Sequence, residues 1–536
     1  MQEMNGKLHK AVFTIKRKGV YAMKRGNVLK KTLAAALGLT MSLSLQTVPA
    51  MAEEAPVEIT IATWNADAGF QGDAVQTAIE EKLGIKIVPM NVTWDDYMQK
   101  IQLWASSGSL PDVFVGPFRT TATYPQWADQ GVISAIPGDL SAYPNLEEYL
   151  SGGAAEEAKL NGTLYCIPRQ TYPDQYWTCL DRIICYRWDL AQKAGIEKEP
   201  ETWDEFSEMI QAIIAADPDG TGIGGMTASD KNLMSGMLMP YGSSIAVDGG
   251  SSFKWVKDEN GQYVPAYFTE DALEGFRFAR NLYDSGVIEK DIALTTNQSA
   301  EEKFLQGSSA AIVISGGFGN KYEKVARYWE EVHGSSYLDD VKALNLMPDK
   351  DGNKTYVMSN SYAWSESYIN AGVSEEKMDK ILKLYDYLLS DEGAFLSTYG
   401  PEGELYDMED GKVVLHDADK MIKDVYPSCD VLSTLVRWNP STYDNRFVAV
   451  WPKEYTEVDN LLVAQAAEVE IPEFYPECTQ KLLELGIEFT VNLDEDFLSI
   501  MTGEEPVEEM WEEIYKQYEA EGLSDMITQI NGAMAE

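Results

Sequence analysis

The chain has 536 residues, of which 45% are hydrophobic and 24% charged, and its 43 Lys and Arg face 86 Asp and Glu for a net charge of −43. This apolar content excludes wholesale disorder, and the length favours two folded lobes over one very large core. The negative charge excludes nucleic acid as a partner and disfavours anionic lipid, because both attract clustered cations.

The first 52 residues differ from the rest, with nine basic residues and one acidic residue. A basic stretch at 23–31, an apolar stretch at 33–45 and the small-residue site at 50–52 are typical of a cleavable signal peptide, with a membrane anchor as the alternative. We therefore expect export, and a mature chain from Glu53 with a net charge of −51. Because no later apolar run approaches about 18 residues, we expect no membrane span in the mature chain.

Strand and helix patterns alternate from residue 57 onwards. In chain order they predict a strand at 57–62, a helix that ends at 83, a strand at 85–89, a helix at 94–106 and a strand at 110–115. Such alternation favours a mostly parallel sheet with helices on both faces, in which ligands bind beyond the carboxyl ends of the strands. The loops at 64–67 and 116–121 are expected at that edge.

The pattern restarts further along the chain and contains no internal repeat. The predicted elements are a strand before Pro168, a strand at 183–186, helices at 189–194 and 203–216, helices at 270–285 and 301–305, a buried strand at 310–314, and helices at 375–389 and 507–520. The fold class is therefore α/β.

The five cysteines, Cys166, Cys179, Cys185, Cys429 and Cys478, form no CxxC pair. An odd number without such a pair does not fit a disulfide framework or a zinc site, so buried thiols are predicted. One oxidised pair among the first three is left open. None of the five lies at the predicted cleavage site, so N-terminal lipidation is not indicated.

Six segments are weak signals one by one but specific in their order. They are Leu110-Pro111-Asp112-Val113, 162–168, 185–195 followed by Pro200-Glu201-Thr202-Trp203-Asp204-Glu205-Phe206, 304–317, 387–393 and 399–403. Together, over about 57–406, the chain resembles the extracellular solute-binding proteins of ABC importers, and most of all the family 1 oligosaccharide binders related to maltose- and alginate-binding proteins.

The resemblance implies a two-lobed periplasmic-binding-protein-like fold of the class II type, with strands that cross between the lobes and a ligand cleft. Lobe one would comprise 53–167 plus 356–405, and lobe two 168–355 plus 406–536, with crossings near Pro168 and at 356–361. The implied function is that of a non-enzymatic, monomeric binding component, which captures an oligosaccharide by hinge closure and delivers it to ABC permease subunits.

One departure concerns the N-terminus. Many Gram-positive members of the family carry a lipobox cysteine that tethers them beside the permease, whereas this sequence has a plain Ala-x-Ala site. The resemblance implies an extracellular or cell-envelope location but leaves the tether unexplained.

Aromatic side chains suit a sugar site, because their faces stack on the C–H side of the ring while polar tips reach hydroxyls. Most of the 13 Trp and 29 Tyr are expected in the cores. Position within the resemblance singles out Trp64, Tyr241, Trp364, Tyr399 and Trp438 as predicted ligand contacts.

The predicted polar contacts are Asn65, Asp67, Arg119, Arg169 and Glu402. Sugar hydroxyls both donate and accept, so they can satisfy such side chains. The alternative is an interlobe salt bridge. The two arginines would also suit an acidic sugar, because guanidinium groups bind carboxylates bidentately.

The segment 217–222 resembles the start of a calcium loop, with oxygen donors Asp217, Asp219 and Thr221 at positions one, three and five and a glycine at position six. Some family members hold calcium here. The later positions of this sequence, Gly225 and Ala228, lack carboxylates. An empty turn and no cofactor are therefore predicted, with calcium as the alternative.

Two other classes of function stay open, a secreted carbohydrate-active enzyme that uses paired carboxylates and a peptide-binding protein of the same architecture. The many acidic residues do not discriminate, because some pair can always be chosen. With only His333 and His416 beyond the N-terminal region, and no G-x-S-x-G sequence, Ser-His and Cys-His hydrolases are disfavoured.

Overall fold

The computed structural model describes residues 55–535 with gaps. The residues left out are 94–95, 120, 229–253, 357–362, 418–419, 439, 441–443, 445, 450, 471–472, 488 and 490. The predicted signal peptide at 1–52 and the predicted ligand contact Tyr241 thus lie outside the described residues.

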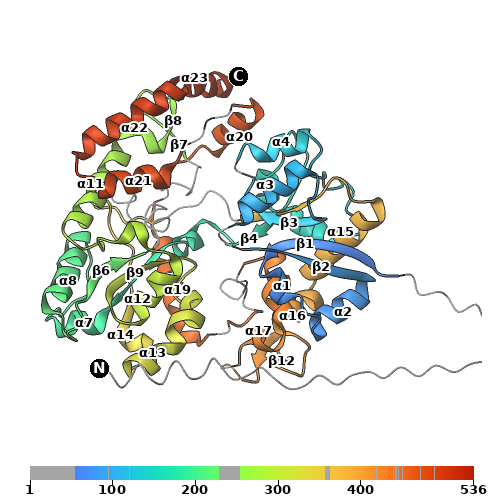
Figure 1. Cartoon of the computed structure of the whole chain (residues 1–536), viewed down its shortest axis with the longest axis horizontal. Helices are drawn as coiled ribbons and strands as arrows, with labels where there is room; N and C mark the ends of the chain where they lie inside the picture. The colour runs from blue at the N-terminus through green and yellow to red at the C-terminus, as the bar shows by residue number, and fades with distance from the viewer. Residues whose placement is uncertain are drawn as a thin grey trace, which may run out of the picture. The chain divides into compact units, whose positions relative to one another are not determined.

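The first sheet has five strands in the order β2-β1-β3-β11-β4 (Figure 1). Their bounds are β1 Val57–Trp64, β2 Ile85–Val92, β3 Val113–Gly116, β4 Ile167–Gln170 and β11 Ala363–Ile369. β1 is parallel to β2 and β3, as the alternating pattern predicts, whereas β11 is an antiparallel strand that the sequence reading missed. The carboxyl ends of β1, β3 and β4 and the amino end of β11 therefore share one edge, the first sheet edge.

The second sheet has four strands in the order β10-β5-β9-β6, with bounds β5 Ile183–Arg187, β6 Gly224–Thr227, β9 Ser309–Ile314 and β10 Val341–Ala343. Successive side chains alternate between two cores, so that Ala311 and Val313 of β9 face one and Ile312 and Ile314 face the other. Burial on both faces explains the continuous apolar run at 310–314. The carboxyl ends of β6 and β9 and the amino end of β5 form the second sheet edge.

Helices cover the first sheet, and their buried side chains share one core with it. Figure 1 shows α2, α3 and α15 beside its strands. The helices are α1 Ala66–Gly69, α2 Ala74–Leu83, α3 Tyr97–Ser107, α4 Thr123–Asp129, α5 Pro144–Leu150, α6 Gly153–Glu157, α15 Glu375–Leu389, α16 Asp391–Tyr399, α17 Ile422–Val425, α18 Pro427–Leu432 and the 3-10 turn η7 Ser433–Leu435, with a hairpin of β12 Tyr406–Glu409 and β13 Lys412–Leu415.

One face of the second sheet packs against helices from both the middle and the end of the chain. They are α7 Trp188–Lys193, α8 Trp203–Ala216, η3 Ala266–Phe268, α11 Glu270–Asp284, η4 Ile292–Leu294, α20 Pro476–Glu484, α21 Leu493–Thr502, α22 Val507–Glu521 and α23 Leu523–Met534, next to a hairpin of β7 Trp255–Lys257 and β8 Tyr263–Pro265.

The opposite face of the second sheet has its own core. It is formed with η1 Gln175–Leu180, α12 Asn297–Leu305, η5 Gly319–Lys321, η6 Tyr322–Ala326, α13 Arg327–His333, α14 Tyr337–Asp340 and α19 Lys453–Ala466.

Helix α8 illustrates how the sequence sets these elements. The Thr202 side chain caps its first turn by accepting a hydrogen bond from the Glu205 amide. Trp203, Phe206 and Ile210 follow at helical spacing on the buried face. The observed helix spans the predicted residues 203–216 without change, because pattern and cap agree.

The C-terminal third of the chain divides between the two sheets. Buried side chains from Leu405 to Phe447 belong to the core of the first sheet, whereas those from Trp451 to Ile530 belong to the cores of the second. Successive core residues thus change from one sheet to the other between Ile167 and Tyr172, between Tyr356 and Tyr368, and between Phe447 and Trp451. The predicted lobe boundaries stay a prediction, and this packing leads us to propose that 406–447 accompany lobe one.

All five cysteines are buried and free. Burial raises the pKa of each thiol above its usual value, to about 12 at Cys478. The prediction of buried thiols is confirmed, and the pair left open among Cys166, Cys179 and Cys185 is not a disulfide in this structure.

Candidate functional site

Three tryptophans named from the sequence meet at the first sheet edge. Trp64 ends β1, Trp364 is the second residue of β11, and Trp438 follows η7. The Trp64 and Trp364 rings stack with centroids 5.6 Å apart, and Trp438 lies 5.6 Å from Trp364 and 6.2 Å from Trp64. Trp364 is 39% exposed. We call these three residues the tryptophan cluster.

Backbone hydrogen bonds bring Trp438 to this edge from far along the chain. The Trp438 amide donates to the Gln170 carbonyl at 2.7 Å, and the Gln170 amide donates to the Val436 carbonyl at 3.1 Å. The Trp438 indole N–H donates to the Trp364 carbonyl at 3.2 Å. The segment after η7 therefore pairs with the edge of β4. This pairing places the Trp438 ring against Trp364.

Arg169 lies beneath the tryptophan cluster with no exposed surface. Its guanidinium carbon is 4.3 Å from the Trp438 ring centroid and 5.2 Å from that of Trp64. Its Nε donates to the Thr434 carbonyl at 2.6 Å and its Nη1 to the Ser365 hydroxyl at 2.7 Å, while Nη2 is buried without a hydrogen-bond partner among the described residues. Burial lowers the pKa of Arg169 to about 9. The geometry makes Arg169 a support for the rings.

Ser365 connects Arg169 to the sheet, and no sequence pattern predicted this role. Its φ is 62°, in the left-handed region that side chains other than glycine rarely adopt. The pairing of β11 with β4 is irregular between Ala363 and Glu366, which is the mark of a β-bulge. A bulge re-aims the neighbouring side chain, and here that side chain is Trp364.

Asn65 and Asp67 come shortly after Trp64 in the chain, and both are exposed. Asn65 adopts a φ of 59° at the start of α1. The Asp67 carboxylate accepts a hydrogen bond from the Ala68 amide at 3.0 Å. Both lie at the same edge as Trp64, and their roles as ligand contacts stay predictions.

Arg119 lies in the loop after β3 and pairs with a carboxylate that the sequence reading did not name. Its Nε donates to Glu366 Oε1 at 3.2 Å, and its amide donates to Glu366 Oε2 at 3.3 Å. The side chains of this pair are 12% and 3% exposed, and the Tyr368 hydroxyl also donates to Glu366 at 2.8 Å. Burial raises the pKa of Glu366, against the opposing effect of Arg119. This ion pair joins two parts of the first sheet.

Two further predicted contacts are not brought into the cluster. Tyr399 is fully buried in the core of the first sheet, where its hydroxyl donates to the Val448 carbonyl at 2.8 Å and accepts from the Val448 amide at 2.7 Å. Glu402 is exposed in the turn after α16. The surroundings of Tyr399 favour a packing role.

The second sheet edge has a different character. The chain leaves β9 through Gly316 and Gly317, both with positive φ. Asp459 of α19, 1% exposed, accepts hydrogen bonds from the amides of Phe318 at 2.6 Å and Gly319 at 3.3 Å. A Cβ at Gly317 would lie 2.8 Å from the Asp459 carboxylate, so the turn requires glycine there. Burial raises the pKa of Asp459 to about 7.

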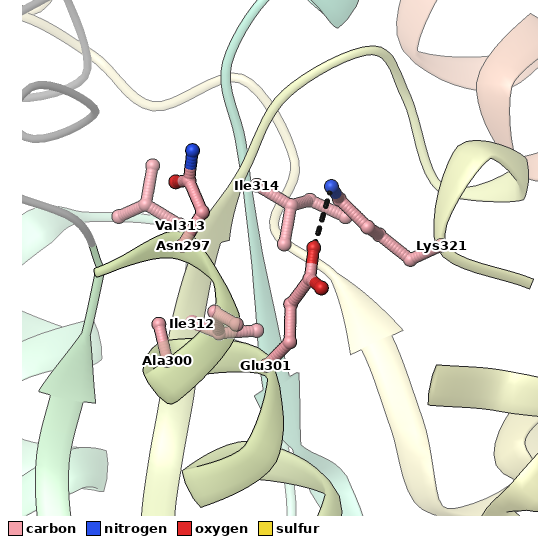
Figure 2. A pocket seen from close by; sticks show the side chains of 7 residues that line it. All are labelled: Asn297, Ala300, Glu301, Ile312, Val313, Ile314 and Lys321. Atoms are coloured by element: carbon pink, nitrogen blue, oxygen red, sulfur yellow. Dashed lines mark hydrogen bonds and ion pairs between the residues drawn. The ribbon is translucent and has the colours of Figure 1, made fainter. Parts of the chain in front are cut away.

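A shallow open pocket lies at this edge, between α12, β9 and η5 (Figure 2). Lys321 reaches across it to Glu301 at 2.9 Å, and the two side chains are 13% and 12% exposed. The other lining residues are Asn297, Ala300, Ile312, Val313 and Ile314. The pocket shares no lining residue with the tryptophan cluster, and an ion pair of the protein itself spans it.

The candidate calcium residues form a hydrogen-bonded turn. The Asp217 carboxylate accepts from the amides of Thr221 and Gly222, each at 3.0 Å, and these bonds, that from Gly222 first, lower the pKa of Asp217. Asp219 pairs with Lys193 at 2.9 Å. Among the described residues, no group of three or more His, Cys, Asp or Glu is placed to hold a metal ion. Asp217 is thus engaged in closing the turn, and Asp219 in an ion pair with Lys193.

Residues 74–403 match the family model of the bacterial extracellular solute-binding proteins. The match covers more than half of the chain, so this protein belongs to that family. Within the part of the chain that the structure describes, no helix is long and apolar enough to cross a membrane.

Curated relatives are similar at a distance. The lipoprotein LipO of Bacillus subtilis is 25% identical over 348 residues, which cover 62% of this chain and 64% of LipO. The polygalacturonan/rhamnogalacturonan-binding protein YtcQ of the same species is 23% identical, over 70% of this chain and 72% of YtcQ. The fructooligosaccharide ABC transporter substrate-binding protein FusA of Streptococcus pneumoniae is 26% identical, over 40% of this chain and 41% of FusA.

Solved structures share the fold over most of the chain. The alginate-binding protein AlgQ2 superposes with a TM-score of 0.68 at 16% identity, covering 90% of this chain and 99% of AlgQ2. FusA in complex with kestose also gives a TM-score of 0.68 at 16% identity, covering 89% of this chain and 98% of FusA. The family and the two-lobed α/β fold predicted from the sequence are therefore confirmed.

Proposed function

We propose that this protein is the extracytoplasmic substrate-binding component of an ABC importer, which captures an oligosaccharide and delivers it to permease subunits. The observation that carries the proposal is the tryptophan cluster, where three rings from separate parts of the chain meet at the first sheet edge. Relatives whose names state binding of polygalacturonan and fructooligosaccharide support the same class of ligand.

The chemistry of the tryptophan cluster suits a sugar. The Trp364 side chain, which is 39% exposed, offers apolar ring surface to the C–H side of a pyranose or furanose ring. Asn65 and Asp67 follow Trp64 directly and present an amide and a carboxylate to hydroxyl groups. Ligands of open α/β sheets bind at this position, beyond the carboxyl ends of the strands.

The chain connectivity suits capture by closure. Three connections, which follow Ile167, Tyr356 and Phe447, join the core of the first sheet to the cores of the second. A few residues in such connections can absorb a hinge motion that brings two lobes together on a ligand. The permease would then distinguish the closed, loaded form from the open form.

Function in transport requires that the protein be exported and act without turnover. The basic and apolar stretches within 1–52 support an exported protein. Its family comprises solute-binding proteins, which supports a binding role over a carbohydrate-active enzyme. We propose that the protein works as a monomer outside the cytoplasm.

The proposal is tested by calorimetric titration of the mature chain, from Glu53, with a panel of oligosaccharides, followed by product analysis of the same samples. We expect saturable binding of at least one oligosaccharide and a raised melting temperature with the sugar intact. Hydrolysis or cleavage of the sugar would support the enzyme instead. Binding of peptides with no response to any oligosaccharide would support the peptide-binding alternative.

A further inference from the structure

We infer that Thr171 is a positioning residue for sugar binding, because its hydroxyl holds the backbone of Trp364 and so directs the ring on which the sugar stacks. This inference rests on the proposed function and adds a residue that sets its stacking surface. Thr171 comes directly after β4 and is partly exposed. Its hydroxyl accepts a hydrogen bond from the Trp364 amide at 2.9 Å, although the two residues are 193 positions apart in the sequence.

The backbone of Trp364 needs such a contact, because it lies outside the regular ladder of the first sheet. The register of β11 with β4 passes from Ala363 directly to Glu366, and the register of β11 with β3 begins at Glu366. The residue after Trp364, Ser365, has a φ of 62°. A residue other than glycine keeps this conformation only where its surroundings hold it. The direction of the Trp364 ring therefore depends on contacts from other parts of the chain.

Side chains from two distant segments supply these contacts. The Thr171 hydroxyl, which accepts from the Trp364 amide, donates to the Arg169 carbonyl at 3.4 Å. Arg169 Nη1 donates to the Ser365 hydroxyl at 2.7 Å. The Trp438 indole N–H donates to the Trp364 carbonyl at 3.2 Å. Removing Arg169 or Trp438 would also remove a contact between the guanidinium and a ring, whereas removing the Thr171 hydroxyl releases the Trp364 amide and removes no ring contact.

The hydrogen bond also joins two of the connections between the sheets. Thr171 lies between Ile167, in the core of the first sheet, and Tyr172, in a core of the second. Trp364 lies in the connection that follows Tyr356. A hinge motion would bend both connections, so a bond between them keeps the ring aligned with Thr171 while the lobes close. A sugar stacked on Trp364 therefore contacts a residue of the hinge.

Thr171→Val tests this role, because valine keeps the branched shape of threonine and removes the hydroxyl. The mature chain is titrated calorimetrically with the oligosaccharide that binds most tightly among the fructo-, galacto-, manno- and galacturono- series. We expect about fivefold weaker binding, the effect of one lost hydrogen bond, with the melting temperature little changed. Thr171→Ser retains the hydroxyl and should bind as the unaltered protein does. Thr171→Ala removes the hydroxyl with less bulk and should repeat the loss, so the test holds even where valine disturbs folding.

Thr434→Val is the matched control at the same edge. The Thr434 hydroxyl donates to the Val431 carbonyl at 3.0 Å and to the Asp430 carbonyl at 3.4 Å, within its own helical turn. This variant removes a threonine hydroxyl that does not contact the Trp364 backbone, so we expect unchanged sugar binding. An equal loss of affinity in the two valine variants would contradict a specific role for Thr171.

A double-mutant cycle separates positioning of the ring from direct contact with the sugar. Because Thr171 acts through Trp364, Thr171→Val should weaken binding about fivefold in the unaltered protein and less than about twofold in Trp364→Ala. The same loss in both backgrounds would show that the hydroxyl contacts the sugar directly, and would contradict the positioning role. Oligosaccharide binding that Thr171→Val leaves unchanged would contradict this inference alone, whereas no oligosaccharide binding by the unaltered protein would contradict the proposed function as well.

Discussion

The two sheet edges differ in the kinds of side chain that form them. At the first, aromatic rings stack on one another above a buried arginine, and the polar groups beneath them face protein oxygens. At the second, backbone amides of a glycine turn donate hydrogen bonds to a buried aspartate, and an ion pair spans the neighbouring pocket. The first edge is a surface of aromatic rings that pack on one another. The second is held by charges and is therefore sensitive to pH.

The first edge should therefore determine the affinity for a ligand, and the second should determine how the stability of the protein responds to pH. A preformed aromatic surface loses little conformational freedom on binding, so stacking contributes directly to affinity. A loop held by one buried carboxylate changes its energy when that carboxylate gains or loses a proton. Substitution of an exposed ring at the first edge should thus change binding, substitution of the buried arginine that supports the rings should change stability, and substitution of Asp459 at the second edge should change how stability depends on pH.

The largest effect is expected from Arg169→Met, which removes the support of the first edge. The loss of two charge-assisted hydrogen bonds and two ring contacts should lower the free energy of unfolding by about 3 kcal/mol or more. Urea denaturation measures this change, and tryptophan emission should shift as the rings rearrange. Arg437→Met, on a partly exposed neighbour, serves as the control. A loss under about 1 kcal/mol at Arg169 would show that the cluster needs no support.

The next effect concerns Asp459 and the second edge. Its pKa is about 7 in the folded protein against about 3.9 when unfolded, so the folded state binds the proton more tightly and stability falls as pH rises from about 4 to 7. In Asp459→Asn this loss should disappear. The difference in unfolding free energy, unaltered protein minus variant, should decrease by a few kcal/mol between pH 5 and pH 8. A difference independent of pH would contradict the assignment of this titration to Asp459.

A smaller effect is expected from Trp364→Ala at the first edge. Removing an exposed stacking face should weaken oligosaccharide binding about tenfold, or about 1.4 kcal/mol, with little change in melting temperature. Tyr328→Ala provides the matched control, because Tyr328 of α13 is 44% exposed and lies on the second sheet's side of the molecule. Calorimetry with the best ligand measures both variants. Equal losses of oligosaccharide affinity in the two variants would show that the ligand does not stack on the tryptophan cluster.

The smallest effects separate a half-buried ion pair from an exposed one. Lys321→Met breaks the pair in the pocket and should cost about 1–2 kcal/mol of unfolding free energy. Lys82→Met breaks a pair whose side chains are 45% and 65% exposed, and should cost about 0.5 kcal/mol or less. Denaturation at low and high salt measures both, and similar losses would indicate that the pocket pair is well screened by solvent.

The fold could be read from the sequence where local and long-range signals agree. β1, β2 and α8 appear where strand alternation and helical spacing predict them, and in α8 the Thr202 cap agrees with that spacing. β11 was missed because its pattern, Ala363 to Ile369, contains buried Ser365 and Glu366 that read as a polar segment. Their burial depends on Arg169 and Arg119, which are distant in sequence.

The candidate site was predictable only in part, because burial again depends on residues that are distant in sequence. Trp64, Trp364, Trp438 and Arg169 meet as one group, but their residue types alone do not say which of them faces a ligand. Tyr399 looked equally suitable and lies in a core. Tyr399 is buried because side chains between Leu405 and Phe447 pack into the core of the first sheet. No local sequence pattern predicts that this part of the chain packs there.

Saturation-transfer NMR tests the central claim most directly, because it reports which sugar protons touch the protein's rings. With the oligosaccharide that binds most tightly, irradiation of tryptophan ring protons should transfer strongly to the C–H protons of one sugar face. The transfer should be lost in Trp364→Ala and kept in Tyr328→Ala. Equal transfer in both variants, or transfer from aliphatic protons alone, would contradict a sugar stacked on the tryptophan cluster.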